Sequence, residues 1–198
     1  MRKNRHLVKA GIIVLLLSML LNACFKLEEL RIDQESKDYC LFKEGSYWIF
    51  QDSATHKIDS VVINQEISYE FSQDGEYKRE SYSTRVTSYS QDNISSWKVR
   101  LVSRFENCAF ISDLFATMYH NGGEFEKIPN YHDVILVNKK DHYSITGITY
   151  SNVKIFEQNT IERINIFFWA KHIGLIRTEI YKDDNIIVKN LIRYNVKQ

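Results

Sequence analysis

Two cysteines in the body of the chain, Cys40 and Cys108, are the first residues whose chemistry matters. In an oxidising compartment they permit a single disulfide, which would stabilise the fold by about 4 kcal/mol through chain entropy. The alternative is a pair of buried thiols that pack as small apolar side chains, and the sequence leaves both open. Neither cysteine lies in the local motif of a catalytic nucleophile, so we expect no catalytic role for either.

Histidines and carboxylates form a second group of candidates. His132-Asp133 and Asp141-His142 could bring metal ligands together across a hairpin. Adjacent residues of a strand point to opposite faces, so each dipeptide offers only one ligand to a shared site. The chain also lacks the helical His-Glu-x-x-His arrangement. We therefore expect no metal and no other cofactor.

The common catalytic fingerprints are missing from the sequence. It contains no Gly-x-Ser-x-Gly elbow, no phosphate-binding loop and no Gly-x-Gly-x-x-Gly motif. Its acidic pairs, Glu28-Glu29 and Asp183-Asp184, fall in an expected tether and an expected turn. Carboxylates that hydrolyse glycosides must instead face each other across a cleft. We predict a protein that is not an enzyme.

Aromatic residues are more numerous than the core of one domain requires, with 12 Tyr, 11 Phe and 3 Trp. Tyr77, Tyr82 and Tyr89 lie among Ser, Thr and Arg, which indicates a solvent-exposed face. Exposed aromatic rings stack on sugars or anchor a protein partner, so these three are candidate binding residues. The alternative is cross-strand pairing that only stabilises the sheet.

The elements that must position these residues are β-strands. In "WKVRLVSRF", apolar and basic side chains alternate, which predicts that Trp97, Val99 and Leu101 share a buried face. Trp48 is expected in the same core. β-Branched and aromatic residues dominate similar runs along the chain, and turn-forming residues separate them. The predicted strands are 46–52, 57–65, 77–89, 96–105, 108–119, 133–138, 142–148, 150–157, 161–170, 173–182 and 186–196.

Short connections between these runs favour antiparallel pairing. We predict one β-rich domain over residues 39–198, either an antiparallel β sandwich or an open or half barrel, with little helix. Residues 24–38 are charged and are expected to form a tether or a short helix. The last three strands should form an antiparallel meander, because the connections at 171–172 and 183–185 are too short for parallel crossovers.

The N-terminal 23 residues predict export. Four Lys and Arg precede an apolar run over 10–21 that is short for a membrane-spanning helix, a pattern typical of a secretory signal peptide. The run ends in Leu21-Asn22-Ala23-Cys24, which resembles the bacterial lipobox. That resemblance implies cleavage before Cys24 and attachment of a diacylglycerol and a further acyl chain, such as palmitate, to this residue. Two or more chains hold a soluble domain stably on a membrane, whereas one chain does not.

Removal of this leader changes the charge balance. Four of the 26 Lys and Arg are lost, which leaves 22 against 25 Asp and Glu. A slightly acidic domain has no general attraction to nucleic acid, so we expect no nucleic-acid partner. The acidic stretch that follows Cys24, ending in Glu28-Glu29, resembles a surface-export signal of Bacteroidetes lipoproteins. Whether the domain faces the periplasm or the exterior stays open.

Three longer stretches, "EGSYWIFQDS", "GITYSNVKIFE" and "FFWAKHIGLIRTEIY", resemble motifs of outer-membrane lipoproteins of unknown function from Bacteroidetes. The resemblance implies a β-rich fold and a lipid-anchored location at the outer membrane, and it carries no established activity. The matching residues are Gly45, Trp48, Phe50, Tyr150, Val153, Phe168, Ala170, Gly174 and Leu175.

Two functional hypotheses follow. The leading one is a non-enzymatic envelope lipoprotein that binds a partner protein or a glycan at the outer membrane. The alternative is a lipid- or lipoprotein-handling half barrel in the periplasm, whose apolar concave face holds acyl chains. A flat aromatic surface would favour the first hypothesis, and an apolar cavity would favour the second.

Overall fold

The computed structural model describes residues 28–74, 77–90, 93–104, 107–112, 118–120, 134–160 and 162–198. These ranges contain one short helix and many strands, as predicted. None of their helices is long and apolar enough to cross a membrane. The elements are β1 (Glu28–Leu30), α2 (Gln34–Cys40), β2 (Tyr47–Asp52), β3 (Ile58–Ile63), β4 (Ser68–Asp74), β5 (Tyr77–Tyr89), β6 (Ile94–Arg104), β7 (Asn107–Ser112), β8 (Met118–His120), β9 (Val134–Ile145), β10 (Ile148–Asn159), β11 (Ile164–Ala170), β12 (Gly174–Lys182) and β13 (Asn185–Asn195).

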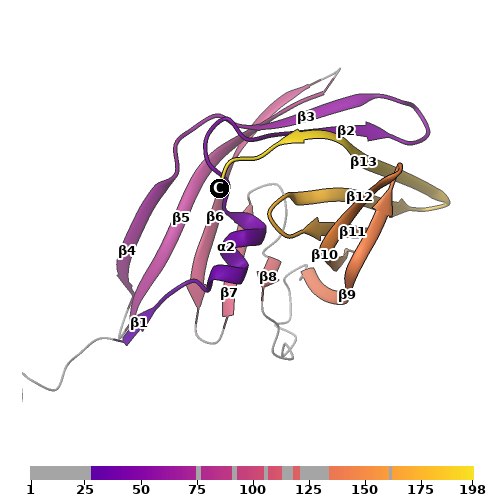
Figure 1. Ribbon diagram of the computed structural model, residues 1–198. Coiled ribbons are helices and arrows are strands. Elements are labelled where there is room, and N and C mark those ends of the chain that lie inside the picture. Colours follow the sequence, from indigo (N-terminus) through magenta and orange to yellow (C-terminus); the bar gives the residue numbers. More distant parts are fainter. Residues whose placement is uncertain are drawn as a thin grey trace, which may run out of the picture.

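All strands belong to one strongly curved sheet (Figure 1). Its order is β1-β5-β3-β2-β13-β12-β11-β10-β9-β8-β7-β6, with β4 paired to β5. Because β5 also pairs with β6, the sheet curls back on itself. Its weakest link is that between β8 and β9, where Met118 and Val134 form the one residue pair found in the described chain. Because this link is so short, the sheet is not closed into a barrel, and because all described strands lie in one sheet, the architecture is an open barrel and not a sandwich.

The C-terminal meander is confirmed. β11 pairs antiparallel with β12, and β12 pairs antiparallel with β13. Asp183 has a φ of 51° in the second turn and Gly174 a φ of 89° at the first, a backbone conformation that Asp and Gly adopt more readily than most residues. A register shift between Phe168 and Trp169 places a bulge beside the first turn.

Two pairings depart from the predicted antiparallel pattern. β1 runs parallel to β5, with Glu28 opposite Tyr77, and β8 runs parallel to β9. Parallel pairing needs a long connection, and both pairs meet this requirement because many residues separate their strands in the chain. The alternation within one strand gives no information on such distant partners.

The β9–β10 hairpin also differs from the prediction. The structure has one strand over 134–145 where the sequence indicates two, at 133–138 and 142–148. The β9–β10 ladder has a register shift between Ile155 and Phe156, and Asn152 in β10 takes a positive φ of 51°. β4 was not expected, since its mostly polar side chains show no buried face. The middle of the predicted strand 108–119 lies outside the described residues.

The packed structure begins before the predicted domain boundary at Tyr39. Leu30 and Ile32 in the expected tether are 9% and 4% exposed. α2 follows, with Asp33 as its N-cap accepting a hydrogen bond from the Ser36 backbone N–H over 2.7 Å. Such a cap satisfies one of the free amides at a helix start. In Figure 1, α2 lies between the β5–β6 arm and the β10–β12 arm of the sheet.

The expected core residues are buried where their side chains are described. Trp48 is 7% exposed and Leu101 is 2% exposed. Val99 is half-buried and packs against the same residues. The side chain of Trp97 lies outside the described part of the structure, so its burial stays a prediction.

Candidate functional site

The curved sheet encloses a cavity of about 400 Å³. Its walls come from the concave sides of the strands, since residues two apart in a strand share one face. The sheet bends far enough to bring β3 and β5 opposite β11 and β12. Most of the lining is apolar or aromatic. The apolar lining residues are Phe42, Trp48, Phe50, Val61, Ile63, Val86, Val99, Phe167, Trp169, Leu175 and Ile180.

One end of the cavity is aromatic and tightly packed. The Phe42 ring meets the Trp48 ring edge-on, with centroids 5.2 Å apart. The Trp48 indole N–H donates to the Ile173 carbonyl over 2.5 Å, so this polar atom is satisfied away from the cavity. A Cβ at Gly174 would lie 3.0 Å from the Phe42 ring. The absence of a side chain at Gly174 therefore lets Phe42 close this end.

The opposite end of the cavity carries most of the polar lining residues. Gln158 is next to last in β10 and Asn165 is second in β11, where the two strands meet. Arg163 directly precedes β11 and is exposed. Asp59 is second in β3 and forms an ion pair with Lys189 of β13. The cavity is thus amphipathic along its length, with an aromatic end and a polar end.

The amides of Gln158 and Asn165 form a buried pair. These residues are direct neighbours across β10 and β11 and are 7% and 4% exposed. Asn165 Nδ2 donates to Gln158 Oε1 over 2.8 Å. Asn165 Oδ1 is buried as well, and no described group of the protein donates to it. A buried carbonyl oxygen without a donor costs about 1–3 kcal/mol, so this oxygen requires explanation.

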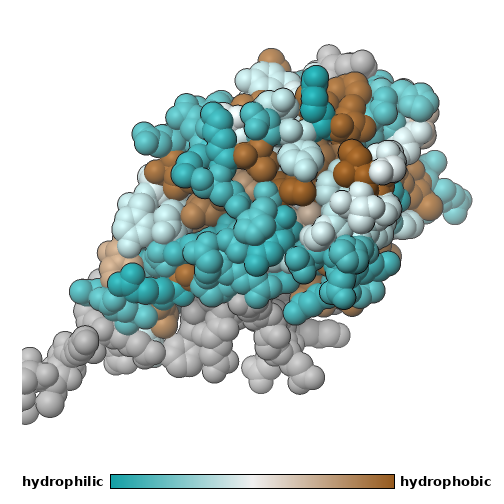
Figure 2. Space-filling model, in the orientation of Figure 1, coloured by the Kyte–Doolittle hydropathy of each residue, from teal (hydrophilic) through white to brown (hydrophobic). Residues whose placement is uncertain are grey.

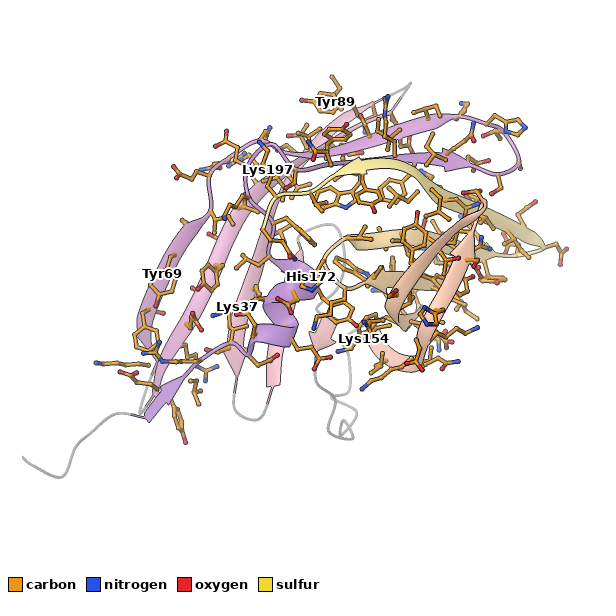
Figure 3. All side chains as sticks on the ribbon, in the orientation of Figure 1. Lys37, Tyr69, Tyr89, Lys154, His172 and Lys197 are labelled. Carbon is orange, nitrogen blue, oxygen red and sulfur yellow. The ribbon has the colours of Figure 1, made fainter. Side chains whose placement is uncertain are left out.

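α2 reaches the cavity with its last residue, Cys40, and connects the two arms of the sheet. On one side, the Lys154 ammonium of β10 lies 2.7 Å from Glu35 Oε1 and 4.5 Å from the centroid of the Tyr39 ring. The Tyr39 hydroxyl donates to the Asn152 carbonyl over 2.7 Å. Burial raises the pKa of Tyr39 to about 12, which keeps this donor protonated. Figure 3 shows Lys37 and Lys154 on either side of the helix.

On the other side of α2, Glu80 of β5 is a buried acceptor. Its carboxylate accepts hydrogen bonds from the Ile32 backbone N–H over 2.7 Å, the Tyr82 hydroxyl over 2.8 Å and the Lys37 ammonium over 3.0 Å. Burial alone would raise the pKa of Glu80, but these three donors outweigh burial and hold the pKa below its ordinary value. The β1–α2 segment is therefore fixed to β5 by a charged centre.

The three tyrosines predicted as binding residues do not form one surface. Tyr77 and Tyr89 lie at opposite ends of β5, about 40 Å apart for an extended strand. Tyr82 points to the other face, where its hydroxyl bonds to Glu80. Tyr82 also packs on Tyr69, its cross-strand partner in β4, with ring centroids 5.2 Å apart. Figure 3 shows Tyr69 and Tyr89 at well-separated places.

The other predicted sites are only in part described. Cys40 lines the cavity, the side chain of Cys108 in β7 lies outside the described residues, and so does Cys24. The Cys40–Cys108 disulfide therefore stays a prediction. His132 is also outside the described ranges, and His142 is exposed on β9. In the described residues no group of three or more His, Cys, Asp or Glu side chains is arranged to hold a metal ion.

Sequence reasoning anticipated an apolar concave face but missed the polar residues on it. Asn165 stands in the apolar run "INIFFW", and its period-two partners Phe167 and Trp169 also line the cavity. A polar residue on the otherwise apolar, buried face of a strand is the sequence signal that could have identified Asn165 as a site residue. Lys189 is a second polar residue on an inward face. It lies in β13, across from Thr178 of β12, and both residues line the cavity.

Comparisons with known proteins give distant similarities in structure. No protein-family model matches the sequence, and no curated protein matches it. A candidate lipoprotein from Parabacteroides distasonis superposes with a TM-score of 0.46 and 13% identity, over 79% of this chain and 99% of the other. A candidate exported protein with a YmcC-like fold from Bacteroides fragilis gives a TM-score of 0.45 and 11% identity, over 79% and 98%. Both come from Bacteroidetes, and similarities this low carry no inference about function.

Proposed function

We propose that this protein is a non-enzymatic envelope lipoprotein that binds the apolar chain of a single lipid-like molecule inside its curved sheet. The leader and Cys24 would place it at the outer membrane through covalently attached acyl chains. Lipid binding, which the sequence offers as the alternative hypothesis, is preferred here over binding of a partner protein or a glycan.

The observation that carries the proposal is the apolar cavity. Its volume of about 400 Å³ lies in the range of about 300–1,000 Å³ typical of small-molecule sites. Aromatic and aliphatic side chains line it, with a few polar groups at one end, which is the usual composition of such sites. An acyl chain that moves from water into this lining gains free energy in proportion to the apolar area it buries.

The partner-protein and glycan hypothesis receives less support. It rests on exposed aromatic residues, and the three tyrosines named for it lie far apart or point to different faces. In the face seen in Figure 2, hydrophilic side chains separate the apolar ones into small groups. Binding sites for protein partners usually contain a compact cluster of aromatic anchors.

Contact quenching of tryptophan fluorescence provides the test. Trp48 and Trp169 both line the cavity, so a brominated alkyl chain bound there lies against their rings. The full-length, lipid-anchored protein is placed in nanodiscs of unbrominated lipid and titrated with an ω-bromoalkane. We expect saturable quenching with a single dissociation constant.

Two variants make the test specific. Val61→Phe adds volume to the lining and should weaken the quenching at least tenfold. Val137→Phe makes the same change at a residue of β9 that is 45% exposed and should leave quenching unchanged. Quenching that is linear and unsaturable, or equal in both variants, would contradict ligand binding in the cavity.

A further inference from the structure

We propose that the ligand carries an uncharged head group with a hydrogen-bond donor, a hydroxyl or a primary amide, and that this head is bound by Asn165 with its apolar chain directed toward Phe42. This inference rests on the proposed function, since it concerns the occupant of the same cavity.

The direction of the ligand follows from the strand register. Gln158 and Asn165 lie where β10 ends and β11 begins, and Asp59 lies at the start of β3 on the same side of the sheet. Trp169 lies near the other end of β11, across from Leu175, and the neighbouring Gly174 lies against the ring of Phe42, which follows α2. A molecule with one polar end and one apolar end fits this gradient in a single orientation.

The need for a donor follows from Asn165. Its Nδ2 is occupied by Gln158, whereas its buried Oδ1 accepts no hydrogen bond from any described group. Buried polar groups in proteins nearly always have a partner, and Asn165 itself is 4% exposed and part of the cavity wall. A hydroxyl or amide N–H of the ligand would supply the missing donor. Because these heads also accept hydrogen bonds, they suit either orientation of the Asn165 amide plane.

The absence of charge on the head follows from the surrounding ions. The charged residues that line the cavity in the described structure are Asp59, Lys189 and Arg163. Asp59 and Lys189 neutralise each other in an ion pair, and Arg163 is exposed to water. A carboxylate placed against Asn165 Oδ1 would meet an acceptor and no unpaired buried cation, and an ion in such surroundings is unfavourable.

The experiment compares probes of equal chain length that differ only in the head. An ω-bromo fatty alcohol, an ω-bromo fatty amide, an ω-bromo fatty acid and an ω-bromoalkane are titrated into the full-length protein in nanodiscs. We expect the alcohol and the amide to bind about tenfold more tightly than the acid and the alkane, the factor expected for one hydrogen bond to a neutral group.

Variants at the polar end then test the residue. Asn165→Leu should remove the advantage of the alcohol and amide while the alkane binds as before. Asn159→Leu is the matched control, because Asn159 is an exposed asparagine at the end of β10, directly after Gln158. Thermal unfolding checks that each variant folds. If Asn165→Leu does not fold, Asn165→Val replaces it, since a β-branched apolar side chain suits a strand and also removes the acceptor.

The outcomes separate the two proposals. If no probe quenches tryptophan fluorescence saturably, ligand binding in the cavity is wrong. If all four probes bind equally and Asn165→Leu changes none of them, the cavity binds apolar chains but the head-group inference is overturned. If the fatty acid binds most tightly, the inference is likewise overturned, in favour of recognition of charge by Arg163.

Discussion

The charged centre beneath α2 allows a quantitative prediction. Glu80→Gln preserves the shape of the side chain and removes its charge. The carboxylate accepts three hydrogen bonds, from Ile32, Lys37 and Tyr82. A hydrogen bond to a charged group contributes about 1 kcal/mol more than a bond between neutral groups. For three bonds to a residue that is 4% exposed, we expect the free energy of unfolding to fall by about 2–3 kcal/mol.

Denaturant unfolding of the detergent-solubilised protein at pH 7 measures this loss. The cycle of Glu80→Gln, Lys37→Met and the double variant isolates the ion pair, for which we expect a coupling of about 1 kcal/mol. Hydrogen exchange should show faster exchange of the α2 amides in Glu80→Gln than in the unaltered protein, because the helix loses its attachment to β5.

The pH dependence gives an independent check on the same residue. The pKa of Glu80 is lower in the folded protein than its ordinary value of 4.5. A carboxyl group whose pKa is lowered by folding contributes its full stabilisation at pH values above its pKa in the unfolded state. This stabilisation is lost as the pH falls through its pKa in the folded state. The stability difference between the two proteins should therefore be constant above about pH 5.5 and shrink as the pH falls below 4.5. A difference below 0.5 kcal/mol at pH 7, or one that grows on acidification, would refute the reasoning.

Three further predictions concern other parts of the chain. Cys24→Ala should prevent lipidation, so the protein should leave the membrane fraction or remain unprocessed, and normal maturation with unchanged fractionation would contradict the lipoprotein assignment. Gly174→Ala should lower stability by about 1–3 kcal/mol, because Gly174 has a φ of 89° and its new Cβ would meet Phe42; an unchanged melting temperature would disprove this. Mass spectrometry under non-reducing conditions should find Cys40 and Cys108 either in one linked peptide or as two buried free thiols, and a disulfide between either residue and another molecule would contradict both interpretations.

Local patterns in the sequence were sufficient to predict most strands. The alternation of apolar and polar residues over 161–196 predicted three strands within a few residues of their observed bounds. Their antiparallel pairing was predictable too, because strands joined by such short turns cannot pair in parallel. The same reasoning identified Trp48 and Leu101 as core. In each case the information lies in adjacent residues.

Features that depend on distant partners were not predictable. Residues 28–38 look like a tether because they are highly charged, yet Lys37 and Glu35 are used to bind Glu80 and Lys154 on two different strands. β4 lacks an apolar face and forms only because β5 extends far enough to pair with it. Sequence alone does not reveal which distant residues receive such contacts.

In the candidate site, too, the features set by neighbouring residues were predictable and those set by distant partners were not. The apolar lining could be anticipated from the inward faces of the strands, whereas the polar end depends on which turns the curvature of the sheet brings together. In the sequence, Asn165 is only an isolated polar residue within an apolar strand. The structure shows that it lies opposite Gln158, with which it pairs. Its free oxygen is a property of that pairing and is not visible in the sequence.

If the protein is lipid-anchored as proposed, the early start of the packed structure determines how the domain is held at the membrane. If Cys24 carries the lipid, four residue steps separate it from Glu28, the first residue of β1, and an extended chain covers at most about 14 Å over that length. Glu28 pairs with Tyr77, so the β4–β5 end of the sheet stays next to the headgroups. The domain then has little freedom to tumble or to reach across the envelope. Any molecule it exchanges must come from its own leaflet or from a partner that approaches the membrane surface.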